Sequence, residues 1–274
     1  MDIWKMILRT RQRVQRVLLA LVAIYFIGGA VLYFTQDHLL FHPKPLPKEY
    51  KFSFQPSFQE ANILFNNNNV NIIKFKPAHQ RKGVVLFYHG NMGNVEHYRQ
   101  YPSIFLRNEY EIWMIDYPGF GKTTGKLTEK LLDSEALLMY DLAAKQISAD
   151  SITIYGKSIG TGVASFVASK KNCRILILET PYYSIPSLAK NYFPIYPVNL
   201  MIKYSFPIHT YLKNIKCPIT IFHGTGDEVI SYKHSLRLKN DNKKIELISI
   251  QNGKHNDLSR YDLFQKKLDS LLAR

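Results

Sequence analysis

The 274-residue sequence predicts an α/β fold in which a mostly parallel sheet is covered by helices on both faces. Two observations lead to this prediction. From residue 83 onward, continuously apolar strands alternate with amphipathic helices, a pattern typical of parallel sheets that are buried on both sides. Polar residues directly follow four of these strands, and function gathers at the carboxyl ends of strands in such sheets. The length suits one large domain with a substantial core.

The N-terminal part of the chain predicts a membrane anchor. Residues 17–34 carry no charge, and a helix of this length spans roughly 27 Å, close to the hydrocarbon thickness of a bilayer. Residues 1–16 form a basic tail. The positive-inside rule then predicts a single-pass protein with a cytoplasmic N-terminus and a non-cytoplasmic catalytic domain, periplasmic in a Gram-negative bacterium. Cleavage of a signal peptide after Ala30 and a buried soluble helix are the alternatives.

The rest of the chain divides into a tether and a domain. Residues 35–57 are rich in proline and aromatic residues and predict an extended tether, and residues 58–274 form the domain. Strands are predicted at residues 61–65, 70–75, 84–88, 111–116, 151–155, 174–178, 219–223 and 245–250, with an asparagine turn at residues 66–69. Helices are predicted at residues 95–107, 127–146, 161–171, 231–239 and 259–272, and residues 182–207 as an irregular stretch.

Composition narrows the classes of partner. The formal net charge is +15, which suits anionic lipid headgroups or acidic substrates, although solvated lysines are the simpler explanation. The sequence shows no nucleic-acid-binding module, so nucleic acid is not expected as a partner. Cys173 and Cys217 each precede an apolar strand and are interpreted as structural residues. Because no Cys and His cluster has metal-ligand spacing, no metal is expected.

Ser158 is the predicted nucleophile. It lies between Gly156 and Gly160, where the strand at residues 151–155 turns into the helix at residues 161–171. So sharp a turn strains the backbone at the serine and leaves room only for glycine beside it, which lifts the hydroxyl clear of the sheet. The N-terminus of the helix favours negative charge that develops there. The alternative is a solvated serine in a glycine-rich turn.

The predicted base and acid follow the last two strands. His255 follows the strand at residues 245–250, and Asp227 follows the strand at residues 219–223. His255 would take the proton of Ser158, and Asp227 would fix the tautomer of the imidazole and stabilise its positive charge. The alternatives are that Asp227 only closes a turn, that Glu179 is the acid, or that His255 only caps its loop.

The developing oxyanion needs hydrogen-bond donors close to Ser158. The backbone N–H groups of Ile159 and Asn91 are the expected donors, unless residues 89–91 form a simple turn. His89 and His223 end strands and are expected to brace their turns. Lys157 is expected to be exposed, as is Glu228 beside the acid.

Five motifs in order resemble the serine α/β-hydrolase superfamily. They are residues 89–91 (His-Gly-Asn), 116–121 (Asp-Tyr-Pro-Gly-Phe-Gly), 156–160 (Gly-Lys-Ser-Ile-Gly), 223–227 (His-Gly-Thr-Gly-Asp) and 253–255 (Gly-Lys-His). The likeness is greatest to the membrane-tethered ABHD-type branch, and it covers residues 52–274. It implies an α/β-hydrolase fold and acyl hydrolysis without a cofactor, by thioesterases acting on acylated proteins or by lipases acting on monoacylglycerols or lysophospholipids. Lys157, Ile159 and Ser231 are conservative departures, since Arg, Leu and Pro are frequent there.

The stretch at residues 182–207 predicts a minimal cap over the site. Tyr182, Tyr192 and Phe193 are its candidate substrate-binding residues, although its aromatic residues could equally contact the membrane or simply pack over the sheet edge. The sequence therefore predicts a membrane-anchored serine hydrolase that cleaves an ester or thioester of a lipid-like or hydrophobic acyl substrate through an acyl-enzyme. A peptidase of the same fold and a catalytically silent, membrane-tethered binding protein are the alternatives.

Overall fold

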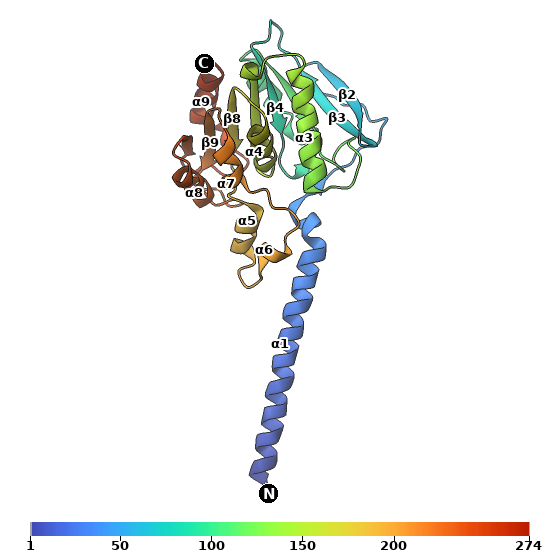
Figure 1. The fold of residues 1–274 in the computed structure, drawn as a ribbon, viewed down its shortest axis with the longest axis vertical. Helices are drawn as coiled ribbons and strands as arrows, with labels where there is room; N and C mark the ends of the chain where they lie inside the picture. The colour runs from blue at the N-terminus through green and yellow to red at the C-terminus, as the bar shows by residue number, and fades with distance from the viewer. Residues whose placement is uncertain (1, 274) are drawn as a thin grey trace.

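The computed structural model describes residues 2–273 and shows a long helix leading into an α/β domain (Figure 1). The domain is built on the strands β2 (Phe58–Phe65), β3 (Asn68–Phe75), β4 (Gly83–Tyr88), β6 (Tyr110–Ile115), β7 (Ile152–Lys157), β8 (Ile175–Glu179), β9 (Ile219–Gly224) and β10 (Ile245–Ile250). They form an eight-stranded sheet in the order β10-β9-β8-β7-β4-β6-β3-β2. The pairs from β6 to β10 are parallel, while β3 runs antiparallel to β2 and β6. The prediction of a mostly parallel sheet is confirmed.

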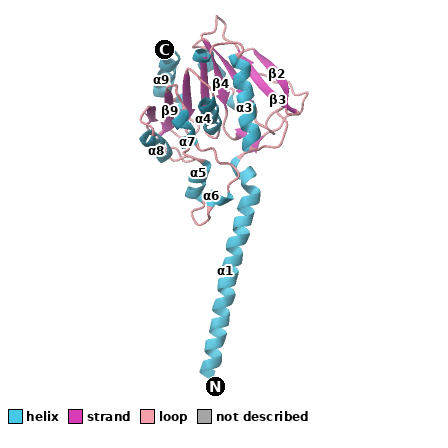
Figure 2. Ribbon diagram, in the orientation of Figure 1, coloured by secondary structure: helices cyan, strands magenta, loops and turns pink. Residues whose placement is uncertain are grey.

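Helices cover both faces of the sheet (Figure 2). One face carries α3 (Glu129–Ala144), α4 (Gly160–Lys170) and α8 (Lys233–Asp241), and the other carries α2 (Tyr101–Leu106) and α9 (Asp262–Ala273). Strand β4 shows why its sequence is continuously apolar. Leu86 and Tyr88 pack toward α3 and α4, whereas Val85 and Phe87 pack toward α2 and α9, because successive side chains of a strand point to opposite faces.

The shorter elements lie around this core. They are β1 (His42–Pro43), β5 (Met92–Gly93), α5 (Ile185–Tyr192), α6 (Val198–Met201), α7 (Ile208–Tyr211) and the 3₁₀ helices at Val95–Tyr98, Ala149–Ser151, Leu212–Asn214 and Leu258–Arg260. The helix expected at residues 95–107 is interrupted, because Pro102 lies in the first turn of α2 and cannot continue a helix from upstream. The stretch at residues 182–207 is more regular than expected, since it contains α5 and α6.

The N-terminal helix α1 (Asp2–Leu40) is longer than the predicted span. Residues 3–40 make one helix that is long and apolar enough to cross a membrane, with a mean hydropathy of 2.5 in its most apolar window. Its 39 residues extend about 58 Å at 1.5 Å per residue. The extended tether therefore begins at Phe41 rather than at residue 35.

The segment after α1 is fixed against the domain. Phe41 is buried in the core, and β1 pairs with β5 in a short parallel ladder. Further along, the backbone N–H of Leu46 donates a 2.7 Å hydrogen bond to the carbonyl of Gly121. These contacts place the C-terminal end of α1 beside the loop that follows β4.

Candidate active site

Ser158 occupies a strained turn between β7 and α4. Its φ is +52°, in the left-handed region that non-glycine residues rarely adopt. The turn needs glycine beside it, because a Cβ at Gly160 would lie 2.1 Å from the carbonyl oxygen of Tyr88. Ser158 is only 8% exposed, and its hydroxyl faces the loops at the carboxyl ends of the strands. This is the conformation that the sequence predicts for a nucleophile elbow.

The three predicted catalytic side chains lie together. His255 Nε2 is 2.9 Å from Ser158 Oγ, and His255 Nδ1 is 2.8 Å from Asp227 Oδ2. They reach one place from three loops, after β7, β9 and β10, because parallel strands end at the same edge of the sheet. The geometry therefore allows a proton to pass from the hydroxyl to the imidazole, with the carboxylate orienting the ring.

Asp227 is held by its own loop as well as by His255. Its Oδ1 accepts hydrogen bonds from the backbone N–H groups of Val229 and Ile230, at 2.9 and 2.8 Å. His223 Nε2 lies 3.2 Å from Oδ2. Burial alone would raise the pKa of Asp227, but the hydrogen bonds from His223 and His255 outweigh burial and hold the pKa below its ordinary value. The carboxylate is therefore ionised and positioned to receive the His255 N–H.

The two histidines at strand ends brace their turns, as expected. His223 Nδ1 is 2.6 Å from the hydroxyl of Ser235, and Nε2 is 2.9 Å from the carbonyl of Ile230. His89 is fully buried, with Nδ1 2.6 Å from the carbonyl of Gly90. Glu228 is exposed, also as expected.

The expectation that Lys157 is exposed is wrong. Its ammonium is buried 2.6 Å from Glu179 Oε1, and it donates a 3.1 Å hydrogen bond to the carbonyl of His255. The other partners of Glu179 are the hydroxyls of Tyr101 and Tyr155, and burial together with the Glu179 charge raises the pKa of both phenols. Glu179, the alternative acid, is thus paired with Lys157, whereas Asp227 contacts His255.

A cavity of about 520 Å³ opens in front of Ser158. Asn91 and Ile159, the expected oxyanion donors, line it together with the nucleophile and His255. The three candidate substrate-binding residues also line it, namely Tyr182, Tyr192 and Phe193. The hydroxyl of Tyr182 donates to the carbonyl of Ile159 at 3.2 Å, and the hydroxyl of Tyr192 donates to the carbonyl of Val229 at 2.7 Å.

Part of the cavity wall comes from α1, which the sequence did not predict. Leu39 and Leu40 line the cavity beside the cap residues Ile185, Leu188 and Ala189. The one feature of the sequence that could have indicated this wall is the pair of leucines, Leu39 and Leu40, that follows the polar residues 36–38. Within residues 2–273, no cluster of three or more His, Cys, Asp and Glu side chains is arranged to hold a metal ion.

A strained serine at a strand–helix turn, hydrogen-bonded to a histidine and through it to an aspartate, defines a hydrolase-type α/β fold. Solved structures share this fold. An esterase from Pyrococcus furiosus superposes with a TM-score of 0.67 at 16% identity, over 86% of this chain and 97% of that chain. Est1E from Butyrivibrio proteoclasticus superposes with a TM-score of 0.64 at 17% identity, over 78% of this chain and 99% of that chain.

Sequence comparison identifies the family. Residues 79–207 match the family model described as serine aminopeptidase, S33. Human alpha/beta hydrolase domain-containing protein 17B is 30% identical over 204 residues, which are 70% of this chain and 67% of that protein. The mouse 17C protein is 27% identical over 218 residues, 76% of this chain and 65% of the relative. The chain belongs to the alpha/beta hydrolase superfamily, as a member of the ABHD type. It spans about two thirds of the length of these relatives.

Proposed function

We propose that the chain is a membrane-anchored serine hydrolase that cleaves a carboxylic ester or thioester of a hydrophobic acyl substrate. The observation that carries the proposal is the continuous hydrogen-bonded series from Ser158 through His255 to Asp227, with links of 2.9 and 2.8 Å. Membership of a hydrolase superfamily supports it.

The reaction follows from the positions of these groups. Ser158 Oγ attacks the substrate carbonyl carbon as His255 Nε2 takes its proton, and the N–H groups of Asn91 and Ile159 stabilise the oxyanion. The C–O or C–S bond then breaks, and the leaving group takes the proton from His255. Water attacks the acyl-enzyme and gives a proton to His255, which returns it to Ser158 Oγ as the carboxylic acid departs.

The character of the cavity favours an acyl substrate over a peptide with a free N-terminus, despite the name of the matched family model. An aminopeptidase must bind a protonated amine, for which a carboxylate is the natural partner. Among the described residues, those that line the cavity include no Asp or Glu, and most are apolar. This lining suits an alkyl or aryl acyl group.

The membrane anchor is the second part of the proposal. The side chains of α1 are exposed along most of its length, with 6% of its most apolar window buried in the structure, as expected for a helix that lipid surrounds. The basic residues precede the apolar run, so the N-terminus is assigned to the cytoplasm and the catalytic domain to the other side. Reporters fused to the C-terminus test this orientation. Activity of a C-terminal reporter that functions only in the cytoplasm would reverse the assignment.

The full-length protein in detergent micelles, assayed with p-nitrophenyl esters of short and long acyl chains, tests the chemistry. Ser158→Ala should lower kcat by about 10⁴-fold or more, because the hydroxyl that forms the acyl-enzyme is lost. Ser169→Ala, on the helix that follows the nucleophile but outside the cavity, is the matched control and should keep its activity. A folded wild-type protein that neither hydrolyses these esters nor reacts with a fluorophosphonate at Ser158 would instead indicate a silent binding protein.

A further inference from the structure

We propose that α1 is part of the substrate site: its C-terminal turns and the cap helices α5 and α6 form a groove that holds the acyl chain of a bilayer-resident substrate. In this arrangement the substrate carbonyl lies at Ser158, and its alkyl chain passes between cap and anchor. The inference rests on the proposed acyl-hydrolase function and identifies where the acyl chain binds.

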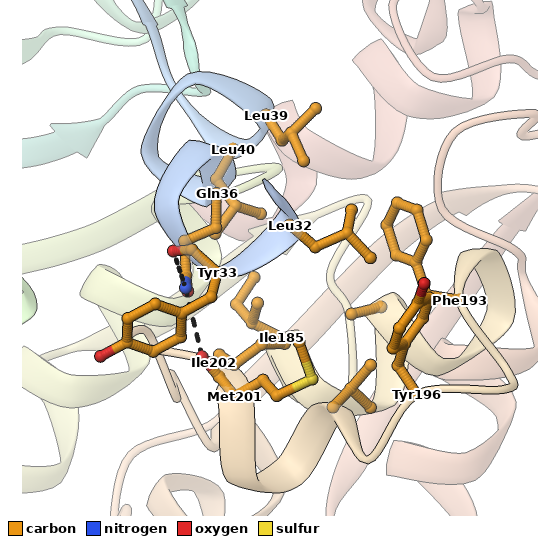
Figure 3. A pocket seen from close by; sticks show the side chains of 12 residues that line it. Leu32, Tyr33, Gln36, Leu39, Leu40, Ile185, Phe193, Tyr196, Met201 and Ile202 are labelled. Carbon is orange, nitrogen blue, oxygen red and sulfur yellow. Dashed lines mark hydrogen bonds between the residues drawn. The ribbon is translucent and has the colours of Figure 1, made fainter. Parts of the chain in front are cut away.

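A second cavity lies between α1 and the cap (Figure 3). Leu32 and Tyr33 line it from α1, and Met201 and Ile202 line it from the end of α6. This cavity adjoins the one in front of Ser158. Five residues line both cavities: Leu39, Leu40, Ile185, Ala189 and Phe193. Apolar side chains shared by the two cavities therefore lie between the nucleophile and the anchor helix.

Among the described residues, those that line the second cavity are mostly apolar, and their polar side-chain groups are the phenols of Tyr33 and Tyr196 and the amide of Gln36. The amide of Gln36 is already engaged, because both its nitrogen and its oxygen form hydrogen bonds with the protein backbone. Gln36 Nε2 donates to the carbonyls of Tyr33 and Met201, at 2.8 and 3.2 Å, and Oε1 accepts from the N–H of Lys203 at 2.7 Å. Figure 3 shows this side chain beside Tyr33 and Met201, with Leu32 of α1 extending toward Phe193 of the cap. The chemistry of the remaining wall suits an alkyl chain.

The cap reaches down alongside the predicted membrane span. The Tyr196 ring stacks on the Tyr25 ring, with centroids 4.8 Å apart, and the Tyr25 hydroxyl donates to the carbonyl of Ile195 at 3.1 Å. Tyr25 lies nine residues before the end of the uncharged segment at residue 34, which is about 14 Å along a helix. The cap residues Ile195 and Tyr196 thus lie beside the middle of the predicted membrane span.

The exposed side chains of the cap tip fit that position. Ile195 is 70% exposed and Leu200 is 87% exposed, which is unfavourable in water but suits contact with lipid. A groove beside such a tip opens toward the bilayer, so its natural occupant is an acyl chain that is already in the membrane. An acyl substrate could then reach Ser158 without its alkyl chain crossing water.

Blocking the groove should change chain-length preference. Ala189 lies where the two cavities meet, so Ala189→Trp in the full-length protein should obstruct the path beyond it. We expect the ratio of kcat/KM for p-nitrophenyl hexadecanoate to that for the butanoate to fall at least tenfold. Ala144→Trp, the same change at an exposed position of α3, is the matched control and should keep the wild-type ratio.

A covalent probe locates the chain directly in the wild-type protein. A long-chain alkyl fluorophosphonate with a terminal photoreactive diazirine would bond to Ser158 Oγ with loss of fluoride, and illumination would crosslink its tail. Crosslinks to residues 32–40 or 193–202 are expected. Crosslinks confined to the opposite wall, around His97 or Asn256, would overturn the inference, as would an unchanged ratio in folded Ala189→Trp. If the wild type shows no Ser158-dependent hydrolysis or labelling at all, the proposed function itself fails.

Discussion

Lys157 and Glu179 form an ion pair inside the nucleophile elbow, with 6% and 1% of their side chains exposed. The pair follows from strand register, because Lys157 and Glu179 are directly opposite each other on β7 and β8. The sequence could not show this pairing, since it requires knowing that these two strands are neighbours and how they align. The pair also holds the catalytic loop, through the hydrogen bond from Lys157 to the carbonyl of His255.

We expect Lys157→Met and Glu179→Gln each to destabilise the protein by about 3–5 kcal/mol, because each leaves a buried polar partner without its counter-charge. In thermal unfolding this corresponds to a lower Tm by roughly 6–20 °C. The double variant should lose less than the sum of the single losses, by about 2 kcal/mol or more.

An exposed pair of the same length provides the control for these variants. Lys171 Nζ also lies 2.6 Å from its partner, Asp141 Oδ1, but both side chains are at least one third exposed. Lys171→Met should cost no more than about 1 kcal/mol. Additive losses for the Lys157 and Glu179 variants would show that the two side chains do not stabilise each other.

The strands and most helices of the domain could be predicted from the sequence because their patterns are local. Continuously apolar runs predicted the parallel strands, and the polar residues that follow these strands indicated Ser158, Asp227 and His255 as the catalytic residues. The cap was harder to predict. The N-cap of α5 is visible in the sequence, as Ser184 followed by Pro186. The contacts of the cap residues Ile195 and Tyr196 with α1, however, join segments about 170 residues apart.

The glycines of α1 acquire a role only through this long-range contact. A Cβ at Gly28 would lie 2.4 Å from the hydroxyl oxygen of Tyr196, and one at Gly29 would lie 3.2 Å from its ring. The small residues that suggest a cleavage site therefore also form a notch for the Tyr196 ring. This second use requires α1 to remain attached to the domain.

Gly28→Leu should displace Tyr196 and loosen the cap. Leucine is a better helix former than glycine by roughly 1 kcal/mol, so any loosening would come from the lost contact and not from a weaker helix. We expect faster hydrogen–deuterium exchange at residues 193–202 in detergent micelles. Ala23→Leu, at an exposed position of the same helix, should leave this exchange unchanged. Wild-type exchange in Gly28→Leu would mean that the cap does not depend on this notch.

Anchor, cap and sheet lie along one direction in the molecule, and this arrangement gives α1 two roles. Residues 17–34 carry the apolar surface that a bilayer would cover, whereas the last turns of the helix line cavities shared with the cap. The tether beyond it is fixed by β1 and β5, so under the proposed anchoring the packed structure would set the position of Ser158 relative to the membrane. The proposed anchor would thus make the distance between bilayer and nucleophile a property of the fold.

The stability of the whole molecule should also depend on pH through a buried carboxyl in α3. Glu135 is 1% exposed, and neither carboxyl oxygen has a hydrogen-bond partner within the described residues. Burial raises the pKa of Glu135 to about 8, whereas in the unfolded chain it would be about 4.3. Between these values the folded state holds a proton that the unfolded state has released, so the free energy of unfolding falls as pH rises.

Glu135→Gln should flatten this decline. The linkage amounts to about 1.4 kcal/mol per pH unit in this window, so the variant should gain several kcal/mol relative to the wild type between pH 5 and pH 8. Part of the decline should remain, because burial and the nearby charge of Glu129 raise the pKa of Asp133 to about 8 as well. Urea unfolding at both pH values measures the effect, with the exposed Glu49→Gln as control. Equal pH dependence in Glu135→Gln and wild type would mean that Glu135 is ionised in the fold, which would require water or a cation beside α3 to stabilise its charge.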